Sequence, residues 1–395
     1  MRLDLDRTEW SRVRMGDVVS QSKEKVDPAA GSVERYVAGE HMKTDNLAIE
    51  SWGEVNDGYL GPAFHCRFRP GQVLYGSRRT YLRKVAVARF DGVCANTTFV
   101  LEPKNPQTLL AALLPFIMTT EGFHAFSISE SKGSVNPYVN WSDVAKYEFD
   151  LPPVDQQRRI ADLLWTVEDE MEAANALTSS AINLQTAVVE RHFVLGGGAI
   201  PRTLADYCPK DGIRIGPFGA QLHAYDYVKT GDVPVIMPQD MIDGSISTAK
   251  IQRISCVKAS ELTVHMVEEG DILLPRRGEL DRRALVSKSE AGWLCGTGSV
   301  RVRVSPGVSV EAVFRAISSP STVAWLKAKA TGTTMPNLNA GIVAKIPVCV
   351  PVGDELGRAL SLSRSAEKAV VKAQVRVATV GKLGSDLRNN LLKGT

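Results

Sequence analysis

Several kinds of chemistry are missing from this chain of 395 residues. Its six cysteines include no Cys-x-x-Cys pair and its six histidines have no metal-ligand spacing, so we expect neither a zinc site nor a disulfide framework. No Gly-x-x-x-x-Gly-Lys-Ser/Thr loop is present, which excludes an encoded P-loop ATPase. Paired carboxylates with a nuclease-type lysine are also missing. We therefore predict buried reduced cysteines, no catalytic residue, no metal and no cofactor bound by this chain.

Long apolar runs are absent as well. The longest, Leu109 to Met118, is too short to span a bilayer and is interrupted by Pro115. The stretch from Met1 to Trp10 is charged and unlike a secretion signal, so we expect a cytoplasmic protein without a membrane partner. No low-complexity tract or block of like charge indicates a disordered tail. The length and the 44% apolar content are typical of two or three globular domains.

What the chain does contain is a repeat with a constant offset of 199 residues. Gly71 matches Gly270 and Arg78 matches Arg277, and further identities keep the same order and the same offset. Chance identities would not hold one offset, so the repeat indicates a duplicated domain with its linker. The further matches are Arg83 with Arg282, Lys84 with Arg283, Gly133 with Gly332, Pro137 with Pro336, Asn140 with Asn339, Ala145-Lys146 with Ala344-Lys345, Pro152 with Pro351 and Asp155 with Asp354.

Each half begins with short β-rich runs separated by Gly, Pro and Asp, which predicts strands and turns. Shorter helices are predicted near Thr108–Phe126 and Val310–Ala330. We therefore expect an α+β protein with two mixed α/β domains, 1–150 and 196–350, and a linker at Gly196-Gly197-Gly198. The predicted strands include Lys84–Phe90, Thr97–Leu101, Val233–Met237, Asp271–Leu274 and Ser299–Val304.

After a Pro-rich stop in each half, a heptad pattern predicts a long helix, in 151–195 and again in 351–395. Asp155 and Asp354 stand at the two helix starts, where they can cap free N–H groups. Duplication predicts that the helices pair as an antiparallel coiled coil with pseudo-two-fold symmetry. The alternative is that each helix packs onto its own domain. The predicted seams are Ile160, Leu164, Val167, Met171, Ala174, Leu177, Ala181, Leu184 and Val188, and Leu356, Leu360, Ala366, Val370, Ala373, Val377, Val380, Leu383, Leu387 and Leu391.

Five segments resemble four motifs of type I restriction–modification specificity subunits. Residues 151–160, LPPVDQQRRI, are similar to the LPPLxEQxxI segment that opens the conserved helix of that family. Residues 132–140 and 331–339 resemble the GxxxPxxN end of its target recognition domain. Residues 215–222 resemble its SGPFGSxL opening, and 270–278 its GDILxxRxG segment. Two departures are that 352–356 lack the Gln-Gln pair and that the first half lacks a clean Gly-Pro-Phe-Gly.

The resemblance implies a specificity subunit that is not itself an enzyme. Its two target recognition domains, 1–150 and 196–350, would be followed by the spacer helices 151–195 and 351–395. Its partners would be double-stranded DNA, two methyltransferase (modification) subunits and restriction/translocase subunits, with S-adenosylmethionine and ATP bound by those partners. The two domains differ in sequence, so the target would be bipartite and asymmetric, and adenine would be the methylated base.

Basic residues gather at the same repeat position in both halves, which favours contact with DNA phosphates and, for arginines, with guanine. The alternative is that they are solvated faces paired with acids elsewhere. Apolar residues outside the helical seam, Leu163, Trp165 and Val189, are candidates for binding partner subunits, unless they widen the seam. The DNA-binding candidates are Arg67, Arg69, Arg78, Arg79, Tyr81, Arg83 and Lys84, with Arg276, Arg277, Arg282 and Arg283.

Two other functions remain open at this point. Asn136-Pro137-Tyr138 partly matches the (D/N)PP(Y/F) loop of adenine methyltransferases, which hydrogen-bonds a flipped adenine. The second proline is missing, the repeat partner reads Met335-Pro336-Asn337, and no Gly-rich cofactor loop precedes it. One alternative is therefore a fused or degenerate adenine-specific DNA methyltransferase, and the other is a scaffold that reads no sequence.

Overall fold

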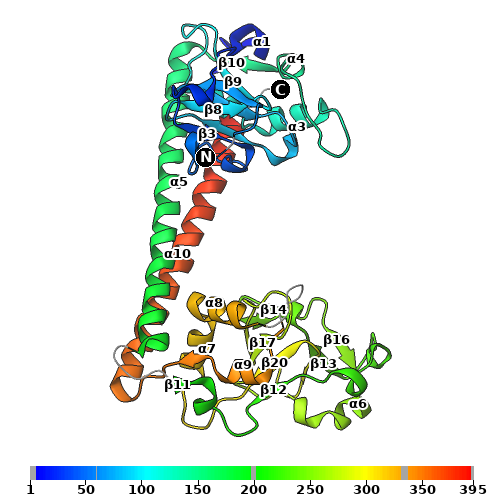
Figure 1. Cartoon of the computed structure of the whole chain (residues 1–395). Coiled ribbons are helices and arrows are strands. Elements are labelled where there is room, and N and C mark those ends of the chain that lie inside the picture. Colours follow the sequence, from blue (N-terminus) through cyan, green and yellow to red (C-terminus); the bar gives the residue numbers. More distant parts are fainter. Residues whose placement is uncertain (1–5, 59, 197–201, 331–336, 393–395) are drawn as a thin grey trace. The chain divides into compact units, whose positions relative to one another are not determined.

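The computed structural model describes residues 6–58, 60–196, 202–330 and 337–392. The chain forms two compact units, one of residues 1–176 with 374–395 and the other of residues 177–373. Each unit combines small sheets, short helices and part of two long helices (Figure 1). The predicted α+β class is confirmed.

The first unit is built on two four-stranded sheets. One has the order β2 (Val19–Gln21), β9 (Thr98–Pro103), β6 (Val73–Gly76) and β7 (Val85–Val87). The other has the order β4 (Gly53–Glu54), β3 (Arg35–Val37), β8 (Gly92–Ala95) and β5 (Phe64–Phe68). An antiparallel pair joins β1 (Ser11–Arg14) to β10 (Glu148–Leu151), and the short helices are α1 (Met15–Val18), α2 (Leu114–Ile117), α3 (Glu121–Ser129) and α4 (Trp141–Val144).

The second unit repeats much of this topology, but its second sheet has three strands and it has one additional strand pair. Its larger sheet has the order β12 (Ile213–Ile215), β20 (Ser299–Val302), β17 (Ile272–Pro275) and β18 (Ala284–Leu285). A second sheet has the order β16 (Gln252–Ile254), β13 (Val233–Ile236) and β19 (Leu294–Cys295), and two pairs join β11 (Arg202–Thr203) to β21 (Pro347–Val348) and β14 (Met241–Ile242) to β15 (Ser245–Ile246). The short helices are α6 (Cys256–Glu261), α7 (Val310–Ser318), α8 (Pro320–Lys329) and α9 (Ala340–Ala344).

The backbone shows the same offset of 199 residues as the sequence. Strands β6 and β17 start 199 residues apart, at Val73 and Ile272. The turn before each strand contains a glycine in the left-handed region, Gly71 with φ 88° and Gly270 with φ 87°. An L side chain rarely adopts such a φ, so this turn explains why both positions are glycine.

The long helices are α5 (Val154–Val189) and α10 (Gly353–Leu391), and each contributes residues to both units. A π-helical turn, Glu190–Val194, follows α5 directly. Within the first unit the helices run antiparallel, because a Cβ on Gly384 would lie 3.2 Å from Val167 Cγ1 and one on Gly381 would lie 3.1 Å from Met171 Cε. The two glycines therefore let the helix backbones approach closely.

The seams differ in detail from the predicted ones. Leu177, Leu184 and Leu383 are wrongly predicted, since each is 48% to 57% exposed. The covered residues recur instead at steps of three and four, and the neighbours covered in place of these leucines are smaller or more polar. The covered residues with this spacing are Gln157, Ile160, Leu164, Val167, Met171, Ala174, Thr178, Ala181, Gln185 and Val188 of α5, and Ala359, Ser363, Ala366, Val370, Ala373, Val377, Val380, Gly384, Arg388 and Leu391 of α10, while the predicted Leu356, Leu360 and Leu387 are half-buried.

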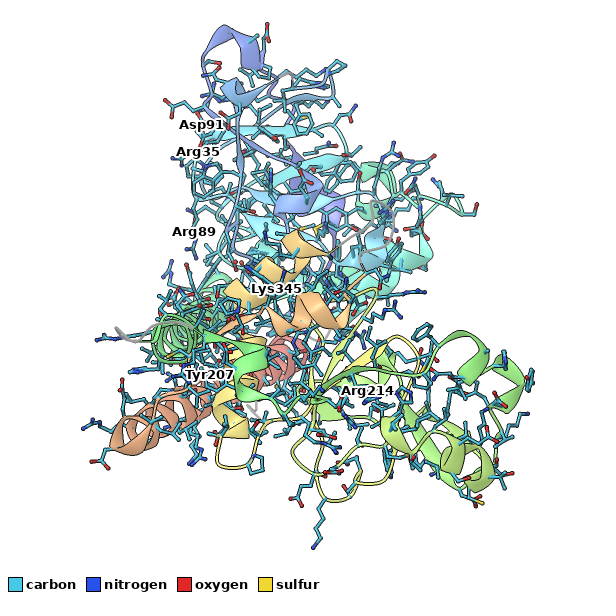
Figure 2. The ribbon with its side chains drawn as sticks, turned by 60° about the horizontal axis from the view of Figure 1, so that its bottom comes forward. Arg35, Arg89, Asp91, Tyr207, Arg214 and Lys345 are labelled. Atoms are coloured by element: carbon cyan, nitrogen blue, oxygen red, sulfur yellow. The ribbon has the colours of Figure 1, made fainter. Side chains whose placement is uncertain are left out.

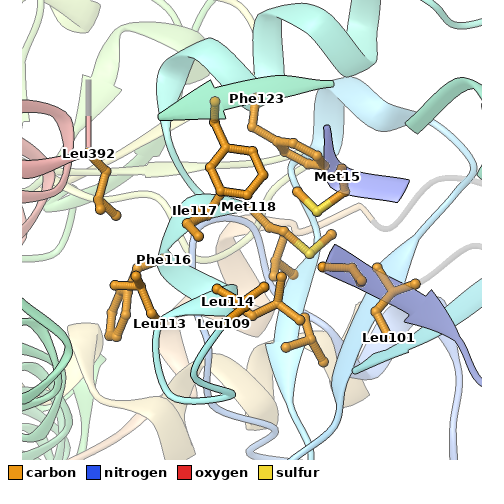
Figure 3. Packing of buried hydrophobic residues seen from close by; sticks show 14 of the residues in the cluster. Met15, Leu101, Leu109, Leu113, Leu114, Phe116, Ile117, Met118, Phe123 and Leu392 are labelled. Carbon is orange, nitrogen blue, oxygen red and sulfur yellow. The ribbon is translucent and has the colours of Figure 1, made fainter. Parts of the chain in front are cut away.

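The main core of the first unit joins both ends of its chain. Helix α2 and the sheet around Leu101 pack with Leu391 and Leu392 from the end of α10 (Figure 3). All six cysteines are free thiols, and three of them, Cys94, Cys295 and Cys349, are buried as predicted, whereas Cys256 is exposed. Among the described residues, no helix is both long and apolar enough to cross a membrane.

His124 predicts a pH-dependent stability of the first unit. Its ring is 2% exposed, and burial, reinforced by the positive charge of Arg83, lowers its pKa to about 4. Because an unfolded histidine titrates near pH 6.5, the folded state should lose up to about 3 kcal/mol as pH falls from 6.5 towards 4. Denaturant titrations of the wild type and of His124→Asn at pH 7 and pH 4.5 should show a smaller pH effect in the variant. An equal effect in both would contradict a neutral buried His124.

Candidate nucleic-acid interface

Two exposed segments of the first unit meet in what we call the first loop pair, residues 77–84 and 131–139. The first segment joins β6 to β7, and the second follows α3. Backbone bridges join Arg78 to Tyr138 and Lys132 to Tyr138. Val139 N–H donates to the Ser77 carbonyl at 2.9 Å, and Arg79 N–H donates to the Pro137 carbonyl at 2.6 Å. These backbone bonds fix the two loops against each other.

The second unit has an equivalent second loop pair, residues 276–283 and 337–339. The bridge from Arg277 to Asn337 and the bond from Leu338 N–H to the Arg276 carbonyl, at 2.9 Å, lie 199 residues after their counterparts in the first unit. The predicted motif residues 331–336, including Gly332 and Pro336, lie outside the described part of the chain. The duplication therefore extends to the loop contacts.

The first loop pair exposes a basic and aromatic surface. Arg78 and Arg79 are exposed and form no ion pair with any residue that the structure describes. Tyr81 is 52% exposed and Tyr138 is 40% exposed. Such a surface can contact phosphates through arginine and stack or hydrogen-bond through tyrosine.

Lys132, in the same loop pair, forms an ion pair with a buried aspartate. Its Nζ lies 2.7 Å from the Asp143 carboxylate, which is buried. Hydrogen bonds from Lys132 and Lys146 lower the pKa of Asp143 to about 2. Asp143 therefore stays charged and orients Lys132, which the sequence patterns did not single out.

The second loop pair presents Arg276 and Arg277. Arg277 is exposed and is without an ion pair among the described residues. The Arg276 guanidinium lies over the ring of Phe218, 5.5 Å from its centroid, and Phe218 is 57% exposed. Phe218 was missing from the predicted site, although the Gly-Pro-Phe-Gly resemblance contained it.

Three of the predicted arginines in the first unit are held by acids of their own unit. Arg67 bonds Asp91 at 2.6 Å and Arg69 bonds Glu24 at 2.7 Å, and Asp91 is labelled in Figure 2. Arg83 lies between Asp45, at 2.8 Å, and Glu121. Lys84 donates to the Gly39 carbonyl. In the free protein these three arginines are therefore paired with acids of their own unit, which was the alternative to DNA contact.

The second unit contains one clear correction. Arg283 is only 4% exposed and donates to the carbonyls of Leu280 and Ile317, the latter near the end of α7. Burial lowers its pKa to about 10. The prediction that Arg283 contacts DNA is therefore wrong for this conformation, because its side chain caps a helix. Arg282 pairs with Glu279 at 2.7 Å.

Two of the three predicted partner-binding residues also have internal roles. Val189 is 8% exposed and belongs to the core of the second unit. Trp165 donates from Nε1 to the Ala112 carbonyl at 2.9 Å and packs edge-on against Phe116. Burial of Val189 leaves little of its side chain for a partner, whereas the role of Trp165, which is half-buried, stays a prediction. Leu163 remains 38% exposed.

Comparison with known proteins agrees with this geometry. The family model for the type I restriction modification DNA specificity domain matches residues 8–179. Residues 8–179 are therefore similar to a type I specificity domain. This segment includes the first loop pair and the start of α5. No group of three or more potential metal ligands occurs in the part of the chain that the structure describes.

One curated relative is similar to about half of the chain, and two solved structures share its fold over nearly the whole chain. The chain is 25% identical over 198 residues to the EcoDI specificity subunit of a type I restriction enzyme from Escherichia coli, a match that covers 47% of this chain and 41% of that protein. A chain from a solved type I R-M system has a TM-score of 0.63 at 16% identity, with 97% of both chains covered. The S subunit of a type I restriction-modification system from M. genitalium has a TM-score of 0.54 at 14% identity, covering 100% of this chain and 99% of that one.

Proposed function

We propose that this chain is the sequence-reading subunit of a type I restriction–modification complex and that each loop pair contacts DNA. The observation that carries the proposal is the duplicated geometry. Arg78 and Arg277, which are exposed and have no ion pair among the residues that the structure describes, stand at equivalent positions of two equivalent loop pairs. Unpaired cations on exposed loops suit phosphate contact, because no internal acid must be displaced.

The two units would read two different half-sites, which makes the target bipartite and asymmetric. The loop pairs share backbone contacts but differ in their exposed aromatic side chains, with Tyr81 and Tyr138 in the first and Phe218 beside Arg276 of the second. Helices α5 and α10 would set the number of unread base pairs between the half-sites. Adenine methylation and cleavage would be performed by modification and restriction subunits that bind S-adenosylmethionine and ATP.

Phosphate contact predicts a defined salt dependence. In a complex of the full chain with its modification subunits, the double variant Arg78→Ala/Arg277→Ala should bind target DNA more weakly and lower the slope of log Kd against log salt by about 2, since each phosphate contact contributes about 0.9. The matched control is Arg69→Ala/Arg364→Ala, whose arginines lie outside the loop pairs and are already paired with acids. Equal slopes for the wild type and the double variant would contradict the proposed surface.

An alternative function is a degenerate adenine methyltransferase, because Asn136-Pro137-Tyr138 lies on the exposed loop pair. Against it, Asn136 Oδ1 accepts from Arg79 Nε and the Pro137 carbonyl accepts from Arg79 N–H, so these groups already serve the loop contact. Calorimetry of the purified chain with S-adenosylmethionine separates the two functions. We expect no binding, and binding together with methyl transfer by the chain alone would contradict the proposal.

A further inference from the structure

Two arginines, Arg79 and Arg276, make the same kind of hydrogen bond, although they do not occupy equivalent positions of the repeat. Arg79 Nε donates to Asn136 Oδ1 at 2.9 Å, and Arg276 Nε donates to Asn337 Oδ1 at 3.0 Å. Each bond crosses from one segment of a loop pair to the other. The offset of 199 residues pairs Arg79 with Gly278, not with Arg276. The same contact is therefore made independently in the two units.

The hydrogen bond at Nε leaves the other end of each guanidinium available for binding. Because Nε is occupied, the two terminal nitrogens remain as a planar fork of N–H donors. Among the described residues, the terminal nitrogens of Arg79 and Arg276 have no hydrogen-bond acceptor. A fork of this kind matches two adjacent acceptors, such as O6 and N7 of guanine in the major groove.

The backbone at Arg79 supports a role for its side chain. Arg79 adopts the left-handed region with φ 52°, where its repeat counterpart is Gly278 with φ 79°. A side chain in this region is less favourable than glycine, and such strain is concentrated at functional sites. Glycine would satisfy the turn, so the arginine side chain, rather than the backbone, explains the residue at this position.

Arg276 is oriented more strongly than Arg79. Its Nε also donates to the Leu338 carbonyl at 3.2 Å, and the Phe218 ring lies against its guanidinium. An aromatic face on one side restricts the plane of the fork and shields it from water. Arg78 and Arg277 have no comparable support, which suits sequence-independent phosphate contact.

We propose that Arg79 and Arg276 each read one guanine in the major groove, one in each half-site, and that Asn136 and Asn337 are positioning residues. This inference rests on the proposed DNA-reading function and adds the identity of the base. A bidentate contact contributes discrimination that corresponds to tenfold or more in affinity, whereas a phosphate contact contributes none.

The test uses the full chain in complex with its modification subunits and target duplexes that carry 7-deazaguanine, which lacks N7, at one guanine at a time. We expect one such substitution in each half-site to weaken wild-type binding by about tenfold. Arg79→Ala should be insensitive to the substitution in one half-site and Arg276→Ala to that in the other. Arg79→Lys should keep only part of the discrimination, because an ammonium group can donate to guanine but lacks the planar fork. Asn136→Ala and Asn337→Ala should reduce it while leaving Kd for nonspecific DNA unchanged.

Arg69→Ala, whose arginine pairs with Glu24 on the same unit, is the matched control and should keep both sensitivities. Target half-sites without guanine, or sensitivities unchanged in Arg79→Ala and Arg276→Ala, would overturn the guanine contacts while leaving the proposed function intact. A uniform loss of affinity in both variants, with the sensitivities retained, would make them phosphate contacts and also overturn the inference. Absence of any sequence preference in the wild-type complex would overturn the proposed function itself.

Discussion

Leu391→Asp should unfold the first unit, although the substitution lies at the far end of the sequence from most of that unit. Leu391 is 2% exposed and packs in the core cluster that contains helix α2 and residues near Leu101. Replacing it removes a buried leucine and places a carboxylate in an apolar core without a partner. Each effect costs several kcal/mol, so a total above about 4 kcal/mol is expected.

Leu383→Asp provides the matched control on the same helix. Leu383 is 51% exposed, so its replacement should change the free energy of unfolding by less than about 1 kcal/mol. Hydrogen exchange followed by mass spectrometry can compare protection of β6 in the first unit with that of β17 in the second. Leu391→Asp should remove protection from β6 and leave β17 protected. A larger effect from Leu383→Asp would contradict the observed seam.

Gln157→Leu should be the second most damaging substitution. The Gln157 side chain is fully buried, and it donates to the carbonyls of Thr108 and Pro152 and accepts from Leu110 N–H, each at 2.8 Å. Leucine would leave these three backbone groups without that partner. At about 1–3 kcal/mol for each unsatisfied buried group, a loss of roughly 3–5 kcal/mol is expected.

The repeat itself provides a comparison for Gln157. Its counterpart 199 residues later is Leu356, which is half-buried against the core of the second unit. At this position the second unit therefore has apolar packing where the first unit has hydrogen bonds. Arg158→Ala, at an exposed neighbouring position, is the control, and denaturant unfolding followed by fluorescence measures both variants. Equal midpoints for Gln157→Leu and Arg158→Ala would show that the hydrogen bonds do not stabilise the unit.

The sequence predicted the architecture because the duplication repeats turns and helix starts at one offset. Gly71 and Gly270 illustrate this, since a left-handed φ requires glycine in both units. The helical seams were less predictable. Leucine at positions 177 and 383 suggested burial, but small residues such as Ala373 and Gly384 face the seam, where they allow close packing of the helices.

Individual site residues were hardest to predict because their partners are distant in sequence. Arg67 and Arg78 look alike in a basic run, yet Asp91 pairs with the first and no described residue pairs with the second. The burial of Arg283 depends on the end of α7, 34 residues away. Asn136 and Asn337 gained a role only when the fold brought each beside an arginine.

The central claim is that each unit reads one half-site independently. A chimaera in which residues 6–151 are replaced by the corresponding domain of another type I specificity subunit tests it most directly, with methylated adenines mapped across the genome of cells that also express the modification subunits. We predict that one half of the methylated motif changes to that of the donor, while the other half and the spacer length remain the same. A motif in which both halves change, or in which neither does, would contradict the account.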